Sequence, residues 1–409
     1  MAKVRRRGCW RATMVAAAMI VLAACNPNRF VSGWVPYWGA TQGRAAYTGG
    51  AGGMFRDVSP FFFSAQADGT IALVGSLSQL NTIVSTAHSY GITVLPTITD
   101  GSGPLTMATV ILADPTARAN HINNIVALAL ANGFDGIDLD YEGFAFTDGR
   151  ATWPTTQPYW RAFVHELADA LHANGKLLSV TIPPVWIAGG QQTGYDVYDQ
   201  QFIATYADRV RLMVYDWSVS SPGPISPMSW LQQVIAYTNS LSIDRSKFQL
   251  GVPAYGRDWG RQANPAERCP DGAFTTKSVE LENIPALVAA RGASPVRHGS
   301  GEMYFTYDTV ATGFSTTPIT PPNYIPPATR VGTIADSAND STGLQPALRL
   351  TPPDIQVSCT IRHFVYYPDA TTIQQHAQAA LDAGWSGIVL WALGYETADV
   401  YTMLADTTP

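Results

Sequence analysis

Eight short runs of apolar and β-branched residues recur along the chain, and stretches with helical periodicity separate them. Continuous apolar runs, in contrast to strict alternation, indicate strands that are buried on both faces, as in a parallel sheet covered by helices. We therefore predict strands at residues 31–38, 58–64, 92–99, 134–142, 177–183, 210–217, 248–255 and 387–393.

The stretches between these runs carry signals for helix starts and helix ends. Asp114 followed by Pro115 is typical of a capped helix start with proline at the first helical position. Glycine at a helix end supplies the left-handed conformation that closes the turn into the next strand, and we expect this role for Gly91, Gly133, Gly175 and Gly384. The repeated helix–glycine–strand unit predicts an α/β fold, a (β/α)8 or TIM barrel. The alternative is an open doubly wound sheet, but no glycine-rich phosphate loop follows the first strand.

One connection is far longer than a barrel loop. After Tyr255 the next helix of barrel type begins near Ala370, more than 100 residues later. We predict a barrel domain formed by residues 31–258 and 365–409, and a small α+β insertion formed by residues 259–364. Within the insertion we expect a helix-like stretch at 278–291, strands at 303–308 and 361–367, and an irregular loop over 309–358.

The N-terminus has the composition of an export signal. Residues 1–24 contain five basic and no acidic residues, and their apolar run at 12–24 is too short to span a bilayer. Leu22-Ala23-Ala24-Cys25 resembles the lipobox of bacterial lipoproteins, in which Cys25 is lipidated and becomes the new N-terminus. We predict a signal peptide over 1–24 and an exported protein on the outer side of the bacterial cell membrane, anchored through Cys25; plain cleavage and secretion is the alternative.

Charge and cysteine content restrict the partners. Without the first 24 residues, 20 Lys and Arg stand against 31 Asp and Glu, a net charge near −11. Such a chain is not expected to recruit nucleic acid by electrostatics, and a neutral substrate fits better. Cys269 and Cys359 can pair in an exported chain, so we expect a disulfide between them.

The segment from Phe134 to Phe144 holds four carboxylates within eight residues of an otherwise apolar stretch. Residues two apart share one face of a strand, so Asp138, Asp140 and Glu142 should point the same way. Close, buried carboxylates raise at least one pKa, which creates an acid beside a base. Three interpretations stay open: the solvent face of an edge strand, a site for a hard divalent cation, and an acid–base site, which the rest of the chain favours.

Aromatic residues recur at the C-terminal ends of the predicted strands, where the chemistry of such a barrel is located. Indole rings pack on the apolar faces of sugars and carboxylates bind sugar hydroxyls, so aromatics around central acids are typical of a carbohydrate cleft. Core packing is the alternative for any single ring. The aromatic residues are Trp34, Tyr37, Trp38, Trp186, Tyr215, Trp217, Tyr255, Trp259 and Trp391.

The sequence resembles glycoside hydrolase family 18, the chitinase-like hydrolases, over the whole predicted barrel. Three of the family's motifs and its sugar-binding tryptophan have counterparts here. These are Asp135, Asp138, Asp140 and Glu142 for D-x-x-D-x-D-x-E, Met213, Tyr215 and Asp216 for M-x-Y-D, G-V-P-A-Y-G at 251–256 for the seventh strand, and Trp391.

The resemblance implies a substrate-assisted retaining mechanism, in which the substrate's own 2-acetamido oxygen attacks the anomeric carbon. Glu142 would protonate the glycosidic oxygen and then act as base on water. Asp140 would orient the acetamide, and Asp138 would share a proton with Asp140 and tune its charge. Tyr215 would hydrogen-bond the acetamide. This mechanism involves no cofactor and no metal ion.

The other matched positions are expected to bind the sugar or to support the strand. Trp391 would form the floor of the pocket, whereas Asp135 has the opposite strand parity and would be structural. The expected substrate-binding residues are Trp391, Tyr37, Met213, Asp216 and Tyr255.

Two residues depart from the chitinase pattern. Gly143 stands where many chitinases carry an aromatic residue, and Tyr141 where they usually have tryptophan. The E-G-F variant and the segment I-R-H-F-V-Y-Y-P-D look closer to family members that act on bacterial cell-wall glycans. We expect a hydrolase that cuts β-1,4 bonds next to N-acetylglucosamine, in chitin oligomers or peptidoglycan. The alternative is a non-catalytic, oligosaccharide-binding lectin on the same barrel, although lectins of this kind typically lose the glutamate that is present here as Glu142.

Overall fold

The computed structural model describes residues 29–101, 106–147, 149–315 and 355–407. The chain forms two compact units. The first contains the described residues up to 257, residues 278–305 and those from 365 onward, and the second contains 258–277 and the described part of 306–364. The insertion that we predicted over 259–364 is therefore divided, because residues 278–305 group with the barrel.

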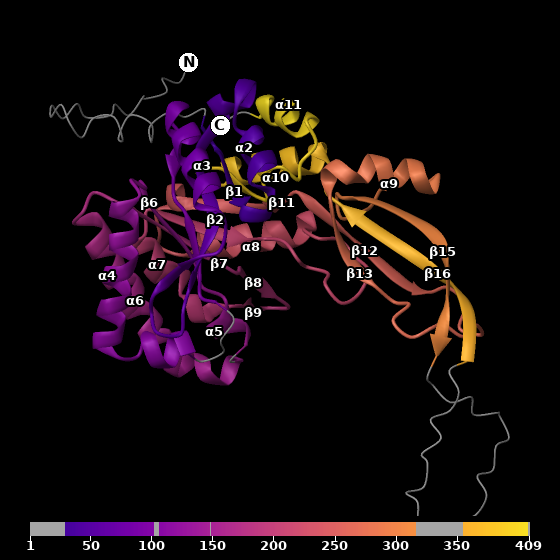
Figure 1. The fold of residues 1–409 in the computed structure, drawn as a ribbon, viewed down its shortest axis with the longest axis horizontal. Helices are drawn as coiled ribbons and strands as arrows, with labels where there is room; N and C mark the ends of the chain where they lie inside the picture. Colours follow the sequence, from indigo (N-terminus) through magenta and orange to yellow (C-terminus); the bar gives the residue numbers. More distant parts are fainter. Residues whose placement is uncertain (1–28, 102–105, 148, 316–354, 408–409) are drawn as a thin grey trace, which may run out of the picture. The chain divides into compact units, whose positions relative to one another are not determined.

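The first unit is a closed barrel of eight parallel strands (Figure 1). The sheet order is β1-β17-β11-β10-β7-β6-β5-β2, and β1 pairs with both β17 and β2, which closes the barrel. The predicted (β/α)8 TIM barrel is confirmed. The strands are β1 (Val31–Pro36), β2 (Phe55–Ala65), β5 (Thr97–Thr99), β6 (Gly136–Asp140), β7 (Leu177–Ile182), β10 (Arg209–Met213), β11 (Phe248–Pro253) and β17 (Ile388–Trp391), with the short strands β3 (Ile71–Leu73), β4 (Thr93–Val94), β8 (Val185–Ala188) and β9 (Gln191–Gly194) beside them.

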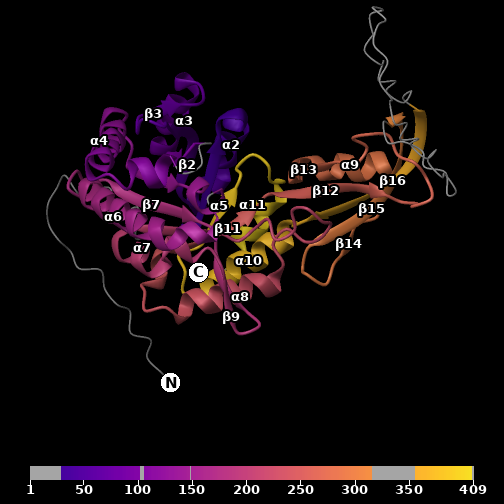
Figure 2. The same ribbon diagram turned by 90° about the horizontal axis from the view of Figure 1, so that it is seen from below.

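Helices follow the strands and surround the barrel (Figure 1 and Figure 2). Asp114 caps α4 as predicted, because its side chain accepts hydrogen bonds from the backbone N–H groups of Thr116 and Ala117. The four glycines predicted at helix ends have φ values between 63° and 82°, the left-handed conformation that the turn requires. The helices are α2 (Ala40–Ala46), α3 (Leu77–Ser89), α4 (Pro115–Ala131), α5 (Gly143–Phe146), α6 (Trp153–His172), α7 (Gln200–Tyr206), α8 (Met228–Ser240), α9 (Ile284–Arg291), α10 (Ala370–Asp382) and α11 (Asp399–Ala405).

The register of three strands gathers polar residues in one part of the barrel. Asp138 on β6 pairs with Thr97 on β5 and with Ser179 on β7, and Asp140 pairs with Thr99. Every residue of β6 is buried. The interpretation of this acidic strand as an edge strand with a solvent face is therefore wrong.

A buried ion cluster joins these strands to their neighbours. Arg211 on β10 is fully buried and pairs with Asp57 on β2 and, at 3.1 Å, with Asp138. Arg209 Nε lies 2.9 Å from Asp57 Oδ2, and Arg211 Nε donates to Gln249 Oε1 on β11 at 3.0 Å. Buried charges of this kind persist only when they are paired and hydrogen-bonded. The cluster thus links four strands through one guanidinium group.

The second unit contains most of β12 (Tyr255–Gln262), β15 (Met303–Ser315) and β16 (Ile355–Tyr367). These strands belong to a five-stranded sheet in the order β13-β12-β16-β15-β14, which also includes β13 (Thr276–Glu280) and β14 (Val296–Arg297). A disulfide joins Cys269 to Cys359, the pairing expected from the sequence. Because the two cysteines are 90 residues apart, the bond closes a long loop and restricts the unfolded chain.

Two predictions for this region had the wrong extent. Residues 309–315 and 355–358, which we expected in an irregular loop, extend β15 and β16. Exposed and half-buried residues alternate along β15. Many of these residues are small or polar, so the alternation does not show as a pattern of apolar residues in the sequence. Within the helix-like stretch 278–291, residues up to Glu280 form a strand and Leu281–Asn283 form a 3-10 turn. The α-helix begins at Ile284, where Pro285 favours the first turn.

The predicted signal peptide at residues 1–24 and the candidate lipidation site Cys25 lie outside the described residues, as does 316–354. In the part of the chain that the structure describes, no helix combines the length and the apolar character that crossing a membrane requires.

Candidate active site

Asp138 is held by side chains from three other strands, β1, β5 and β7, in addition to the buried guanidinium of Arg211. Its donors are Trp34 Nε1 and Thr97 Oγ1, each 2.9 Å from Oδ2, and Ser179 Oγ and Thr181 Oγ1, which lie 2.7 and 3.0 Å from Oδ1. Donors thus occupy both carboxylate oxygens, and the described contacts include no hydrogen bond to Asp140. The charge of Asp138 raises the pKa of Asp140, and the proton sharing that we expected between the two residues stays a prediction.

Asp140 is the last residue of β6, and its side chain is 6% exposed. Burial, followed by the nearby charges of Glu142 and Asp138, raises the pKa of the Asp140 carboxyl well above its usual value. Its Oδ1 atom is buried and has no hydrogen-bond partner within the described residues. Because buried polar atoms are normally hydrogen-bonded, this oxygen is suited to an N–H donor from a ligand.

Glu142 lies beyond the end of the strand. Its φ of −109° and ψ of −28° place it at the start of the short helix α5, so the strand alternation that we predicted covers only Asp138 and Asp140. Burial, followed by the charges of Asp100 and Asp216, raises the pKa of Glu142 to about 7. A carboxyl group with such a pKa can both donate and accept a proton near neutral pH.

Tyr141 fixes the chain between these two acids. Its hydroxyl group lies 2.6 Å from His121 Nε2, and His121 Nδ1 lies 2.6 Å from the carbonyl oxygen of Gly69. A carbonyl oxygen only accepts, so Nδ1 carries the hydrogen and Nε2 accepts from Tyr141. Tyr198 donates its hydroxyl to the Tyr141 carbonyl oxygen at 2.7 Å. The backbone before Glu142 is therefore held by two buried phenols and one imidazole.

Asp100 is a site residue that sequence reasoning missed. It follows β5, is 8% exposed, and accepts hydrogen bonds from the backbone N–H groups of Glu142 at 3.1 Å and Gly143 at 2.7 Å. Burial outweighs these hydrogen bonds and raises the pKa of Asp100 to about 6. Its place directly after the third predicted strand was a usable signal, because active sites of barrels form at strand ends.

Asp216 follows β10, and its charge contributes to the raised pKa of Glu142. It has a positive φ of 61°, its Oδ1 accepts a hydrogen bond from the Tyr255 hydroxyl, and its Oδ2 lies 2.7 Å from Arg257 Nη2. The Tyr215 and Tyr255 rings lie 6.3 Å apart, edge to face. Burial raises the pKa of Tyr215 well above its usual value, so its hydroxyl remains a donor at neutral pH. Arg257 is a second residue that sequence reasoning missed.

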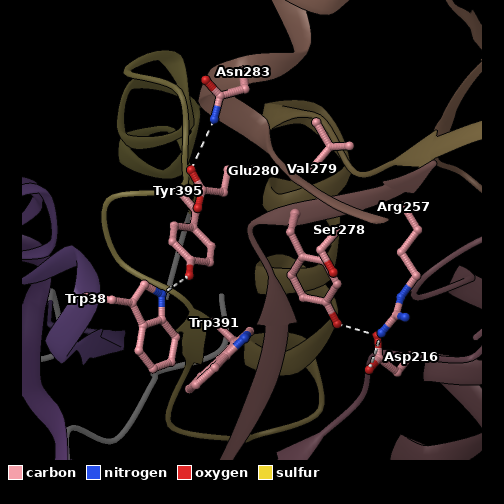
Figure 3. A pocket seen from close by; sticks show the side chains of 10 residues that line it. Trp38, Asp216, Arg257, Ser278, Val279, Glu280, Asn283, Trp391 and Tyr395 are labelled. Carbon is pink, nitrogen blue, oxygen red and sulfur yellow. Dashed lines mark hydrogen bonds and ion pairs between the residues drawn. The ribbon is translucent and has the colours of Figure 1, made fainter. Parts of the chain in front are cut away.

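A cavity of about 450 Å³ adjoins Asp216 (Figure 3). Trp391 lies in it as predicted, and its ring packs edge-on against Phe61 and Trp38. Trp38 Nε1 donates to the Tyr395 hydroxyl at 2.7 Å. The cavity combines aromatic faces with carboxylate, amide and hydroxyl groups, and its lining residues are Trp38, Asp216, Tyr255, Arg257, Ser278, Val279, Glu280, Asn283, Trp391 and Tyr395.

A second cavity, of about 400 Å³, contains Glu142. Along this cavity the Trp186 ring packs edge-to-face against Trp217 and Trp230, and Trp217 is 48% exposed. Asp216 lines both cavities, so the two adjoin at this residue. The lining of the second cavity is Glu142, Phe146, Pro183, Pro184, Trp186, Tyr195, Met213, Tyr215, Asp216, Trp217, Val219 and Trp230.

Three of the predicted rim aromatics lie elsewhere. Trp34 is 1% exposed and binds Asp138, so it supports an acid and does not face either cavity. Tyr37 packs edge-on against Trp38 and Phe62 and lines neither cavity. Trp259 is fully buried and belongs to the second unit.

Asp135 lies at the opposite end of β6 from the other acids. Its Oδ2 accepts a hydrogen bond from the backbone N–H of Val94 at 2.8 Å and lies 3.0 Å from His88 Nε2. Asp135 thus ties the start of β6 to β4, which is consistent with the structural role suggested by its strand parity.

The acids do not form a recognisable metal centre. Within the described ranges, no group of three or more His, Cys, Asp or Glu side chains could hold a metal ion. We expect turnover to survive exhaustive dialysis against EDTA, because the oxygens of Asp138 already have protein donors. Activity that is lost on dialysis and restored by one divalent cation would contradict this expectation.

Comparison with known proteins agrees with this geometry. A curated relative, the cortical fragment-lytic enzyme of Bacillus subtilis, is 23% identical over 353 residues, which cover 85% of this chain and 66% of the relative. The chain spans between 46% and 66% of the length of the curated bacterial relatives that it matches.

Solved structures show the same fold. A chitinase from Chromobacterium violaceum matches with a TM-score of 0.68 and 21% identity, covering 93% of this chain and 98% of that one. The spore cortex-lytic enzyme SleL of Bacillus megaterium matches with a TM-score of 0.67 and 18% identity, covering 94% and 75%. The family model for glycosyl hydrolases family 18 matches residues 37–396, which include every acid of the site. The chain therefore belongs to glycoside hydrolase family 18.

Proposed function

We propose that this protein is a glycosidase that hydrolyses β-1,4 bonds next to N-acetylglucosamine by a substrate-assisted retaining mechanism. The observation that carries the proposal is the position of Glu142 in one of two adjoining aromatic cavities, with Asp140 buried beside it. A glycan chain that occupies both cavities would pass Asp216, which lines both, with its scissile bond near Glu142.

In the first step, the protonated Glu142 donates its proton to the glycosidic oxygen as the bond to the anomeric carbon breaks. The acetamide oxygen of the same sugar attacks that carbon, and pre-organised attack of this kind can contribute about 7–11 kcal/mol. The free Oδ1 of Asp140 would accept the acetamide N–H, and the Tyr215 hydroxyl would donate to the acetamide oxygen.

In the second step, the ionised Glu142 removes a proton from water, and the water oxygen attacks the anomeric carbon. The ring formed by the acetamide opens, and the product keeps the configuration of the substrate. Both steps require Glu142 to change protonation state, which its pKa of about 7 permits near neutral pH.

The substrate that we propose is a neutral stretch of N-acetylglucosamine-containing glycan, from bacterial cell wall or from chitin. The curated cortical fragment-lytic relative and the sequence variant around Gly143 favour the cell-wall glycan. The predicted signal and Cys25 would place the enzyme outside the cell membrane, where that glycan lies.

Product analysis tests the proposal. Purified protein is incubated with N-acetylglucosamine oligomers and, separately, with purified cell wall, and the products are identified by mass spectrometry and by NMR of the anomeric proton. We expect new reducing ends with retained configuration. Inverted products would contradict the mechanism, and binding without any cleavage would favour the lectin.

The pH profile follows from the pKa of Glu142. Burial raises this pKa to about 7, so the carboxyl group is protonated below that pH and ionised above it. Because only the protonated form can donate to the leaving oxygen, we expect kcat/KM to fall about tenfold per pH unit above pH 7. A profile of kcat/KM from pH 4 to pH 9 checks this, and undiminished activity at pH 9 would contradict it.

A further inference from the structure

Asp100 lies where a charge can influence the proposed general acid. Its two carboxylate oxygens accept hydrogen bonds from consecutive backbone N–H groups, those of Glu142 and Gly143. It directly follows β5, one residue after Thr99, which is in register with Asp140. Asp100 therefore fixes the turn that carries Glu142 relative to the barrel interior.

We propose that Asp100 is a positioning residue for catalysis, which orients Glu142 through the backbone and, by its negative charge, keeps Glu142 protonated at the working pH. This inference rests on the proposed role of Glu142 as general acid. Asp100 is outside the four-acid motif and outside the motif of the sixth strand.

Gly143 provides an independent steric observation. A Cβ atom placed on Gly143 would lie 2.9 Å from Asp100 Oδ2 and 3.3 Å from Asp100 Cγ. Any side chain at this position would push the carboxylate away from the two N–H groups. Gly143, which departs from the chitinase pattern, therefore leaves free the space that the Asp100 carboxylate occupies.

The charges around Glu142 come from several elements. After burial, Asp100 is the largest influence that raises the pKa of Glu142, ahead of Asp216. The pKa of Asp100 is about 6 and that of Glu142 about 7. Between these values Asp100 is ionised while Glu142 is protonated. The other ionisable side chains that interact with this pair are Asp140, Tyr141, Tyr195, Tyr198 and Tyr215.

The substitution Asp100→Asn tests the proposal, because asparagine keeps the size of the side chain and one acceptor oxygen but removes the charge. Loss of a neighbouring negative charge lowers the pKa of Glu142. We expect the alkaline limb of the kcat/KM profile to move about one pH unit lower. The ratio of the variant's kcat/KM to that of wild type should then be roughly tenfold smaller at pH 8 than at low pH.

Two further variants separate this effect from a general loss of structure. Asp114→Asn makes the same chemical change at the exposed cap of α4, where asparagine caps equally well, and its pH profile should match that of wild type. Gly143→Ala displaces Asp100 without changing its charge. We expect it to lower kcat at all pH values more than it changes KM, and to move the alkaline limb in the same direction as Asp100→Asn.

An unchanged alkaline limb in a folded Asp100→Asn variant would overturn the proposal, because a purely structural role would lower activity equally at every pH. If Asp100→Asn does not fold, an unchanged limb in Gly143→Ala would overturn it instead. Failure of the proposed function is seen separately, since wild-type protein would then cleave none of the N-acetylglucosamine substrates.

Discussion

Glu142→Gln is expected to lower kcat on N-acetylglucosamine oligomers by roughly a hundred- to ten-thousand-fold, while the affinity for the oligomers stays close to that of wild type. Glutamine has the shape of the protonated glutamic acid but no proton to give to the leaving oxygen. The two cavities that hold the sugars are formed mainly by other residues, so binding should persist. Steady-state kinetics and calorimetric titration with the same oligomer measure the two effects.

The leaving group offers a sharper test of this role. An aryl glycoside with a good leaving group needs little protonation, so Glu142→Gln should lose much less of its first-step rate on that substrate than on the oligomer. Glu166→Gln is the matched control, since it changes a half-exposed glutamate that pairs with Arg118 outside the site. Equal losses on both substrates would argue against proton donation by Glu142.

Asp140→Asn is expected to lower kcat by roughly a hundred- to a thousand-fold on both kinds of substrate. The substrate's own acetamide group is the proposed nucleophile, and every substrate depends on it whatever its leaving group. Asparagine can turn its NH2 group towards the acetamide N–H, where an acceptor is needed, and unlike a carboxyl group it can never ionise to stabilise the cation. The loss should therefore be independent of the leaving group, in contrast to that of Glu142→Gln.

Thermal unfolding of the Asp140→Asn variant serves as its control. In the wild type the Asp140 carboxyl is buried, has a raised pKa and leaves one oxygen without a partner, so asparagine should not destabilise the fold. An Asp140→Asn variant with wild-type kcat, or with losses that follow the leaving group, would contradict acetamide control by this residue.

The strands and the acids of the site were predictable because both depend on local periodicity. Continuous apolar runs and glycines at helix ends define the barrel, and alternation within β6 correctly places Asp138 and Asp140 on one side. Glu142 departs from this alternation because the strand ends at Asp140 and the backbone turns into α5. That turn is held by Asp100, 42 residues earlier in the chain.

The contacts that complete the site were not predictable, because they join residues that lie far apart in the sequence. Trp34 was expected to face sugar, but it donates to Asp138 on β6, a strand that is not its neighbour in the sheet. Arg257 follows an aromatic motif and pairs with Asp216 from another strand. Such pairings are long-range, and no local pattern encodes them. The extension of β15 was not predicted, because its small and polar residues give only a weak alternation of hydrophobicity along the sequence.

The buried ion cluster around Arg211 has a consequence for efforts to make this enzyme resist heat. Barrel interiors are usually filled by branched apolar side chains, and replacing a buried ion cluster with well-packed apolar residues is often neutral or stabilising by about 1–4 kcal/mol. Variants that replace only Arg211 and Asp57 would not gain this stability, because Arg209 would keep its buried charge without the Asp57 carboxylate. Those variants would also remove the cation that pairs with Asp138. Screens for thermotolerant forms should keep these positions fixed and vary the outer helices.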